Sequence, residues 1–69
     1  MEHKVRFCER LKKLMEEKNL SRRKLEEVTG LSNQVISYWL LEKRVPSLHS
    51  LDVLADYFGV TIDYLVGRQ

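Results

Sequence analysis

Several features that would indicate other classes of protein are scarce in this chain. It has one cysteine, so no intramolecular disulfide can form, as is usual in a reducing cytoplasm. Three glycines and one proline, with no run of β-branched residues, favour helices over strands. No apolar run approaches the roughly 20 residues of a membrane helix, and the N-terminus lacks an apolar signal core. We therefore expect a cytoplasmic, all-α protein without a membrane partner.

The composition is that of a small folded domain with an uneven charge. The 69 residues are 43% hydrophobic, enough for one domain with a small core, which we place at residues 1–69. The net charge is only +2, but residues 1–30 hold nine Lys/Arg against six Asp/Glu, whereas residues 47–69 hold one Arg against three Asp. A basic end and an acidic end would orient the domain toward a polyanion.

Apolar residues recur at helical spacing in five segments, each bounded by capping residues. Serine or threonine stands where a side-chain oxygen can accept the first amide protons, at positions 21, 32, 47 and 61. Asparagine or glycine, which tolerate a positive φ, follows most segments, at positions 19, 30, 59 and 67. The pattern predicts helices at about residues 4–18, 22–29, 33–41, 48–58 and 62–66.

The same spacing predicts which side chains turn inward. The first segment would bury Phe7, Leu11 and Leu14, with Cys8 and Met15 alongside. The short second and third segments would bury Leu25, Val28, Leu31, Ile36 and Trp39, and the fourth Leu48, Leu51, Leu54, Ala55 and Phe58. The side chains that stay exposed at the start of the third segment are small and polar. They suit either an ordinary solvated face or contact with base edges.

Five motifs carry a resemblance to a known family. They are LKKLMEEKNLS, the turn TGLS, VISYW, KRVPSL and, most specifically, LADYFGVTIDYLVG. Together they span roughly residues 7 to 67, and the chain resembles the phage repressor and Cro-type helix-turn-helix domains of the XRE family. The resemblance implies a compact, lambda repressor-like bundle of five short helices, with the second and third forming the helix-turn-helix, in a bacterial or phage-derived protein.

The resemblance also implies the residues that contact DNA. Base edges would be contacted by Asn33, Gln34, Ser37 and Tyr38, and phosphates by Ser21, Arg22, Ser32, Lys43 and Arg44. Side-chain chemistry agrees for Asn33 and Gln34, because an amide can bond bidentately to adenine N6 and N7. Tyr38 could contact a thymine methyl group or a phosphate, or could only pack on the surface. Arg22 replaces the usual glutamine and would add phosphate affinity without sequence information.

The chain departs from the family pattern at several positions. Glu26 stands where a small residue is usual, so either the helices are more widely spaced or its side chain bends into solvent. Leu40-Leu41-Glu42 replaces Glu-Asn-Gly, so either the third helix runs on or Glu42 adopts a strained turn. Met15 and Leu40 replace an arginine and a glutamate that pair in resembling sequences, and we expect the two apolar side chains to touch each other instead.

We interpret the chain as a DNA-binding transcriptional regulator, a repressor that binds a palindromic operator as a homodimer. Dimer contacts would come from Val60, Ile62, Tyr64 and Val66, by resemblance. We expect no enzyme activity, no cofactor and no small-molecule ligand. His3, Cys8 and His49 lack metal-ligand spacing, so no metal site is predicted. The alternative is a protein-interaction module, such as an antitoxin-like or adaptor domain on the same fold, which the extra apolar pair Leu40-Leu41 would suit.

Overall fold

Five helices make up the computed structural model, which describes residues 6–68. In chain order they are α1 (Phe7–Glu17), α2 (Arg22–Thr29), α3 (Asn33–Leu40), α4 (Leu48–Phe58) and α5 (Ile62–Leu65). No strand occurs over these residues, and none of their helices is long and apolar enough to cross a membrane. The all-helical prediction is therefore confirmed, although residues 4 and 5 of the expected first helix lie outside the described residues.

The N-terminal ends of four helices are capped as the sequence predicts. The hydroxyl oxygens of Ser21, Ser32, Ser47 and Thr61 accept hydrogen bonds from the backbone N–H groups three residues later, at 3.1, 3.2, 3.2 and 3.0 Å respectively. Each bond satisfies one of the amide groups that lack a partner in a first helical turn, and such a cap typically contributes about 1 kcal/mol. Local sequence therefore fixes where α2, α3, α4 and α5 begin.

The C-terminal end of α3 is unusual. The helix stops at Leu40, and the left-handed position after it is occupied by Glu42, with φ 58°. The N–H group of Glu42 donates to the Trp39 carbonyl, and that of Lys43 donates to the Tyr38 carbonyl. This pair of hydrogen bonds is the Schellman motif that ends many helices. Of the two outcomes expected for the missing glycine, the strained turn is the one observed. The ends of α1 and α4 have the same two bonds, with Asn19 and Gly59 at the left-handed position.

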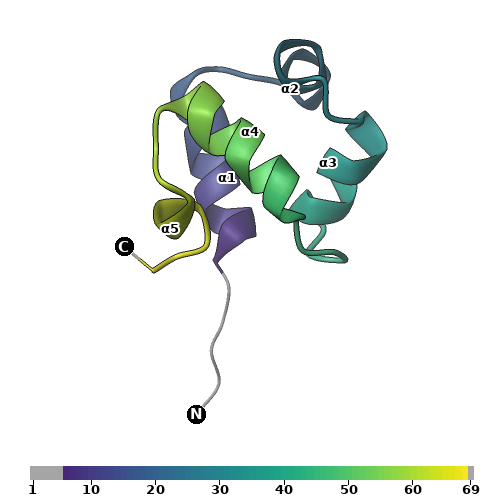
Figure 1. Cartoon of the computed structure of the whole chain (residues 1–69). Coiled ribbons are helices and arrows are strands. Elements are labelled where there is room, and N and C mark those ends of the chain that lie inside the picture. The colour runs from purple at the N-terminus through teal and green to yellow at the C-terminus, as the bar shows by residue number, and fades with distance from the viewer. Residues whose placement is uncertain (1–5, 69) are drawn as a thin grey trace.

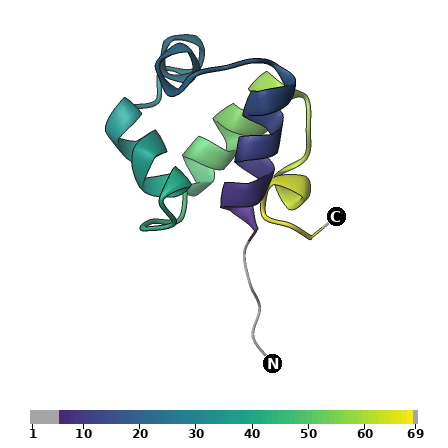
Figure 2. The same cartoon turned by 180° about the vertical axis from the view of Figure 1, so that it is seen from behind.

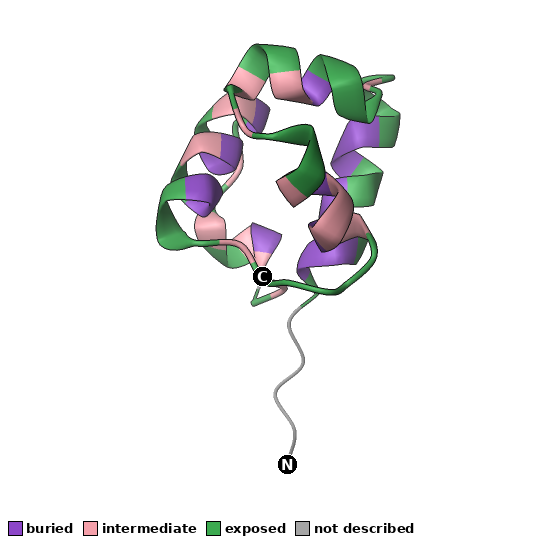
Figure 3. Ribbon diagram, turned by 90° about the vertical axis from the view of Figure 1, so that its right-hand side faces the viewer, coloured by how far each residue is buried: buried purple, intermediate pink, exposed green. Residues whose placement is uncertain are grey.

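The core lies between the helices. Figures 1 and 2 show α1 and α4 crossing the middle of the molecule, with α5 on one side and the α2–α3 pair on the other. The buried residues line the inward sides of all five helices (Figure 3). Phe7 packs edge-on against Trp39, with the ring centroids 5.4 Å apart. This contact joins the start of α1 to the inner side of α3, so α3 is docked on the core by its apolar side.

Two of the predicted core residues are exposed. Val28 is 38% exposed and Leu48 is 73% exposed, so both predictions were wrong. Each lies at the edge of its apolar stripe, where neighbouring elements leave part of the side chain open to solvent. Leu31 is half-buried against the core, and the other predicted core residues are buried.

Candidate nucleic-acid interface

The outer side of α3 carries the four residues predicted to contact bases. Ile36 and Trp39 are 0% and 2% exposed, respectively, and attach the helix to the core. Asn33 and Gln34 are exposed, whereas Ser37 and Tyr38 are half-buried. Because residues four apart share a helix face, the buried pair leaves these four side chains on the opposite side. We call this set, Asn33, Gln34, Ser37 and Tyr38, the reading face.

Glu26 caps the start of α3 from the preceding helix. Its carboxylate Oε2 accepts a hydrogen bond from the backbone N–H of Asn33 at 3.0 Å. The side chain is half-buried, so it does not bend away into solvent as one alternative proposed. An anion at a helix N-terminus interacts favourably with the helix dipole. Together with the Ser32 cap, Glu26 sets the position at which the reading face begins. The only sequence signal for this role was an acidic residue where resembling chains have a small one.

The middle of the reading face is connected to the loop that follows α3. Gln34 Nε2 donates to Tyr38 Oη at 3.2 Å. The Arg44 guanidinium lies over the Tyr38 ring, with Cζ 4.8 Å from the ring centroid. A cation over an aromatic face is typically stabilised by about 0.5–1 kcal/mol at an exposed site. Tyr38 therefore holds one predicted base-contacting side chain and one predicted phosphate-contacting side chain in place.

A second connection joins the reading face to α2. Arg22 Nη1 donates to Ser37 Oγ at 2.9 Å, although the two residues are fifteen positions apart in the chain. The sequence predicted a phosphate contact for Arg22, but its guanidinium lies against the reading face. Neither the separation nor the residue types of this pair indicated the bond from sequence.

The remaining predicted phosphate contacts flank the reading face. Ser21 and Ser32 are exposed residues whose hydroxyls cap α2 and α3. Lys43 is exposed beside Arg44 in the loop between α3 and α4. Five of the nine residues assigned to DNA take part in side-chain contacts with one another, in two separate groups: Arg22 with Ser37, and Gln34 with Tyr38 and Arg44.

The predicted dimer residues lie on the other side of the molecule, at and around α5 (Figure 1). Val60, Ile62, Tyr64 and Val66 are half-buried because they pack against the core of their own chain. The Arg10 guanidinium also lies 4.4 Å from the Tyr64 ring centroid. Among residues 6–68, the most exposed large apolar side chains are elsewhere, around the α3–α4 loop: Leu41, Val45 and Leu48, at 64%, 75% and 73%.

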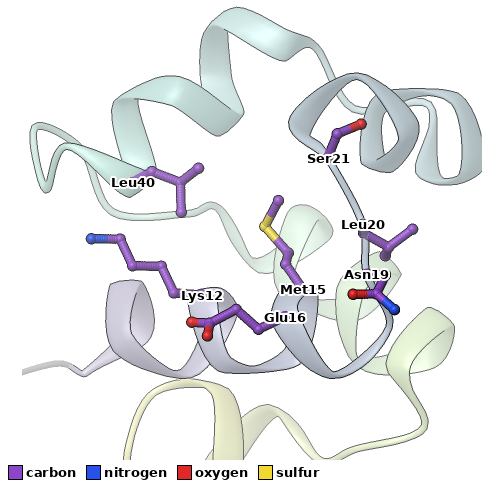
Figure 4. A pocket seen from close by; sticks show the side chains of 7 residues that line it. All are labelled: Lys12, Met15, Glu16, Asn19, Leu20, Ser21 and Leu40. Carbon is purple, nitrogen blue, oxygen red and sulfur yellow. The ribbon is translucent and has the colours of Figure 1, made fainter.

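Met15 and Leu40 line the same open pocket, of about 450 Å³ (Figure 4). Met15 is 7% exposed on α1, and Leu40 reaches toward it from the end of α3. Lys12 and Glu16 form part of the rim. The shared pocket supports the expected proximity of Met15 and Leu40, and their direct contact stays a prediction.

Cys8 and His49 have no metal-binding surroundings. Cys8 is buried, and its Sγ donates to the Leu40 carbonyl oxygen at 3.3 Å. His49 is exposed in the first turn of α4, and His3 lies outside the described residues. Among residues 6–68, no group of three or more His, Cys, Asp or Glu side chains could hold a metal ion.

Comparisons with known proteins agree with this geometry. A helix-turn-helix family model matches residues 11–65. The transcriptional activator BcrR of Enterococcus faecalis is 37% identical over 65 residues, covering 94% of this chain and 32% of that protein. The uncharacterized transcriptional regulator YobD of Bacillus subtilis is 30% identical over 61 residues, covering 88% and 54%.

A solved structure is also similar. A transcriptional regulator from Listeria innocua superposes with a TM-score of 0.84 at 29% identity, covering 94% of this chain and 61% of that one. The chain thus spans about a third to a half of the curated relatives it matches.

Proposed function

Because this chain belongs to the helix-turn-helix family, we propose that it binds double-stranded DNA sequence-specifically and regulates transcription, with α3 in the major groove. The observation that carries this proposal is the reading face. Its four side chains are polar and face away from the core, and three of them already have fixed partners in the free protein. Side chains held in place lose less conformational entropy on binding than free ones.

In this proposal the contacts divide into two kinds. Asn33 and Gln34 would read base edges, since amide groups offer a donor and an acceptor together. Lys43 and Arg44 would bind phosphates from the loop beside α3, with Ser21 and Ser32 contributing from the helix caps. Phosphate contacts fix the register of the protein on the duplex but carry no sequence information.

We further propose that the protein acts as a dimer on a palindromic operator and represses transcription. One domain of this size covers a half-site, and two copies would place their recognition helices about 34–36 Å apart. The half-buried apolar residues around α5 would provide the contact, and so small an apolar set suits an interface that forms mainly on DNA. Sedimentation with and without a self-complementary duplex tests this. A single protomer on a full palindrome at saturation would contradict it, and a promoter reporter distinguishes repression from activation.

A second candidate function is docking of another protein. The exposed set Leu41, Val45 and Leu48, all in or beside the α3–α4 loop, favours it, because exposed apolar patches often mark an interaction site. Salt dependence separates the two functions. Phosphate contacts release counterions, so binding to duplex DNA should weaken steeply as salt rises.

The testing experiment is selection of bound sites from a pool of random duplexes, followed by two variants. Gln34→Ala should cost about 1–3 kcal/mol on the selected duplex and relax preference at one base pair. Arg44→Ala should weaken binding to all duplexes and reduce the salt slope by about 1. An unenriched pool would contradict the proposed function. Equal weakening of selected and random duplexes by Gln34→Ala would contradict its assigned role.

A further inference from the structure

Arg22 is held in a place that a phosphate contact does not require. Its Nη1 donates to Ser37 Oγ at 2.9 Å. Ser37 follows Asn33 by four residues and Gln34 by three, so it shares their helix face. The bond therefore draws the guanidinium from the start of α2 across to the middle of the reading face.

The guanidinium keeps most of its hydrogen-bonding capacity in this position. An arginine side chain has five N–H donors in a planar fork. One of them is used on Ser37, which leaves enough for a second, two-bond contact. Glu26 is the acidic residue one turn after Arg22 on α2. Its carboxylate Oε2 accepts a hydrogen bond from the Asn33 N–H, so this oxygen is engaged with α3 and not with Arg22.

We propose that Arg22 is a base-reading residue that recognises guanine, and that Ser37 is the residue that positions it. A guanidinium can donate two bonds to guanine O6 and N7, which is the most frequent specific contact in the major groove. The proposal rests on the proposed function, since it assumes that the reading face enters the groove. It predicts a G·C pair in each half-site, in addition to the base pairs read by Asn33 and Gln34.

The proposal replaces the role expected for Arg22 from sequence. A phosphate contact would add affinity on every duplex and no preference. A guanine contact adds preference at one position. Alanine separates the two roles, because it removes the guanidinium altogether, whereas a lysine ammonium could still donate to guanine O6 and N7. Losing a phosphate contact lowers affinity on every duplex alike, and losing a guanine contact lowers preference at one position.

The test uses the same random duplex pool with the wild-type protein, Arg22→Ala and a matched control, Arg23→Ala, which loses the same charge. Arg23 is the next residue of α2 and is exposed. We expect the wild type to select a guanine that Arg22→Ala no longer selects and Arg23→Ala still does. The loss of discrimination at that position should be about 5- to 140-fold, the range for one good bidentate pair.

A modified duplex tests the atoms involved. Replacing the selected guanine by 7-deazaguanine removes the N7 acceptor, which should weaken the wild-type protein severalfold and leave Arg22→Ala unaffected. Ser37→Ala should reduce the guanine preference, and Ser37→Thr, which keeps the hydroxyl, should restore it. A fold-stabilising role alone for Ser37 would leave the preference unchanged in Ser37→Ala.

The outcomes are distinguishable. If the wild type enriches no motif, the proposed function fails. If it enriches a motif whose every position survives Arg22→Ala, only the role of Arg22 is overturned. The same conclusion follows if Arg22→Ala weakens selected and random duplexes equally and lowers the salt slope by about 1, because that is the behaviour of a phosphate contact.

Discussion

Helices α1 and α4, which we call the scaffold, and the helix-turn-helix of α2 and α3 are stabilised by different interactions. Helices α1 and α4 each contribute five buried residues, whereas α2 contributes only Leu25 and α3 only Ile36 and Trp39. The geometry of α2 and α3 depends to a larger extent on polar side chains, namely Glu26 on the start of α3 and Arg22 on its middle. Burial thus defines where the scaffold lies, and hydrogen bonds refine how the reading face is presented.

This difference predicts where substitutions act. Changes in the scaffold should affect the free energy of unfolding by several kcal/mol. Changes in the polar contacts of α2 and α3 should affect it by about 1 kcal/mol or less, with their main effect on DNA binding. The predictions below test that division.

The largest effect is expected for Leu54→Ala. Leu54 is 0% exposed in the middle of α4, and truncating such a leucine costs about 2–5 kcal/mol through lost burial and the cavity left behind. Leu48→Ala on the same helix is the matched control, because its side chain is 73% exposed and should change stability by less than about 0.5 kcal/mol. Urea unfolding followed by circular dichroism measures both. Equal losses would refute the assigned burial.

The next effect concerns Met15 and Leu40, at the junction of the two regions. Met15→Arg and Leu40→Glu should each destabilise the fold by about 1–3 kcal/mol, because each replaces an apolar side chain packed in or against the core by a charged one. The pocket that both residues line has room for the longer side chains, so the double variant should recover much of the loss. A double-mutant cycle with coupling of about 0.5–3 kcal/mol supports the contact, whereas additive losses contradict it.

Glu26→Ala tests a polar contact within the helix-turn-helix. It leaves the Asn33 N–H without its carboxylate partner, and we expect a loss of about 1 kcal/mol in unfolding free energy, since the group is half-exposed and hydrated in part. Glu27→Ala is the control, because Glu27 is the exposed neighbour on the same helix. Should both variants lose the same amount, the hydrogen bond contributes nothing of its own.

The smallest effect is a gain. Glu42→Gly removes the strain of a non-glycine residue in the left-handed conformation at φ 58°. The gain in stability is partly offset, because glycine has more conformational freedom in the unfolded chain. We expect a net stabilisation of about 0.5–1 kcal/mol, visible as a rise in Tm of a few degrees. Glu42→Ala keeps the positive φ and should show no gain. A rise in Tm for alanine as well would point to the charge rather than the backbone.

Features that depend on neighbouring residues could be predicted from the sequence, whereas features that depend on contacts between distant residues could not. The ends of α2 and α4 were predicted to the residue, because Ser21, Gly30, Ser47 and Gly59 act on their immediate neighbours. Leu48 was placed wrongly because helical spacing defines an apolar stripe but not which of its edges another helix covers.

In the candidate site, too, features that depend on how the helices pack could not be predicted from the sequence. The reading face on α3 follows from the inward positions of Ile36 and Trp39, which the sequence predicted. Its polar contacts could not be predicted, because the Arg22–Ser37 bond spans fifteen residues and exists only once α2 and α3 are packed. Glu26 was noticed as a departure, but its capping role depends on that same packing.

The position of Trp39 gives the protein a built-in optical probe. It is the single tryptophan of the chain, and its indole is 2% exposed against Phe7. Intrinsic fluorescence therefore reports whether α3 is docked on α1, since the emission shifts to longer wavelength when water reaches the ring. Any molecule on the reading face lies on the far side of the same helix, so one sample can report folding by its emission while binding is followed separately by the anisotropy of a labelled duplex.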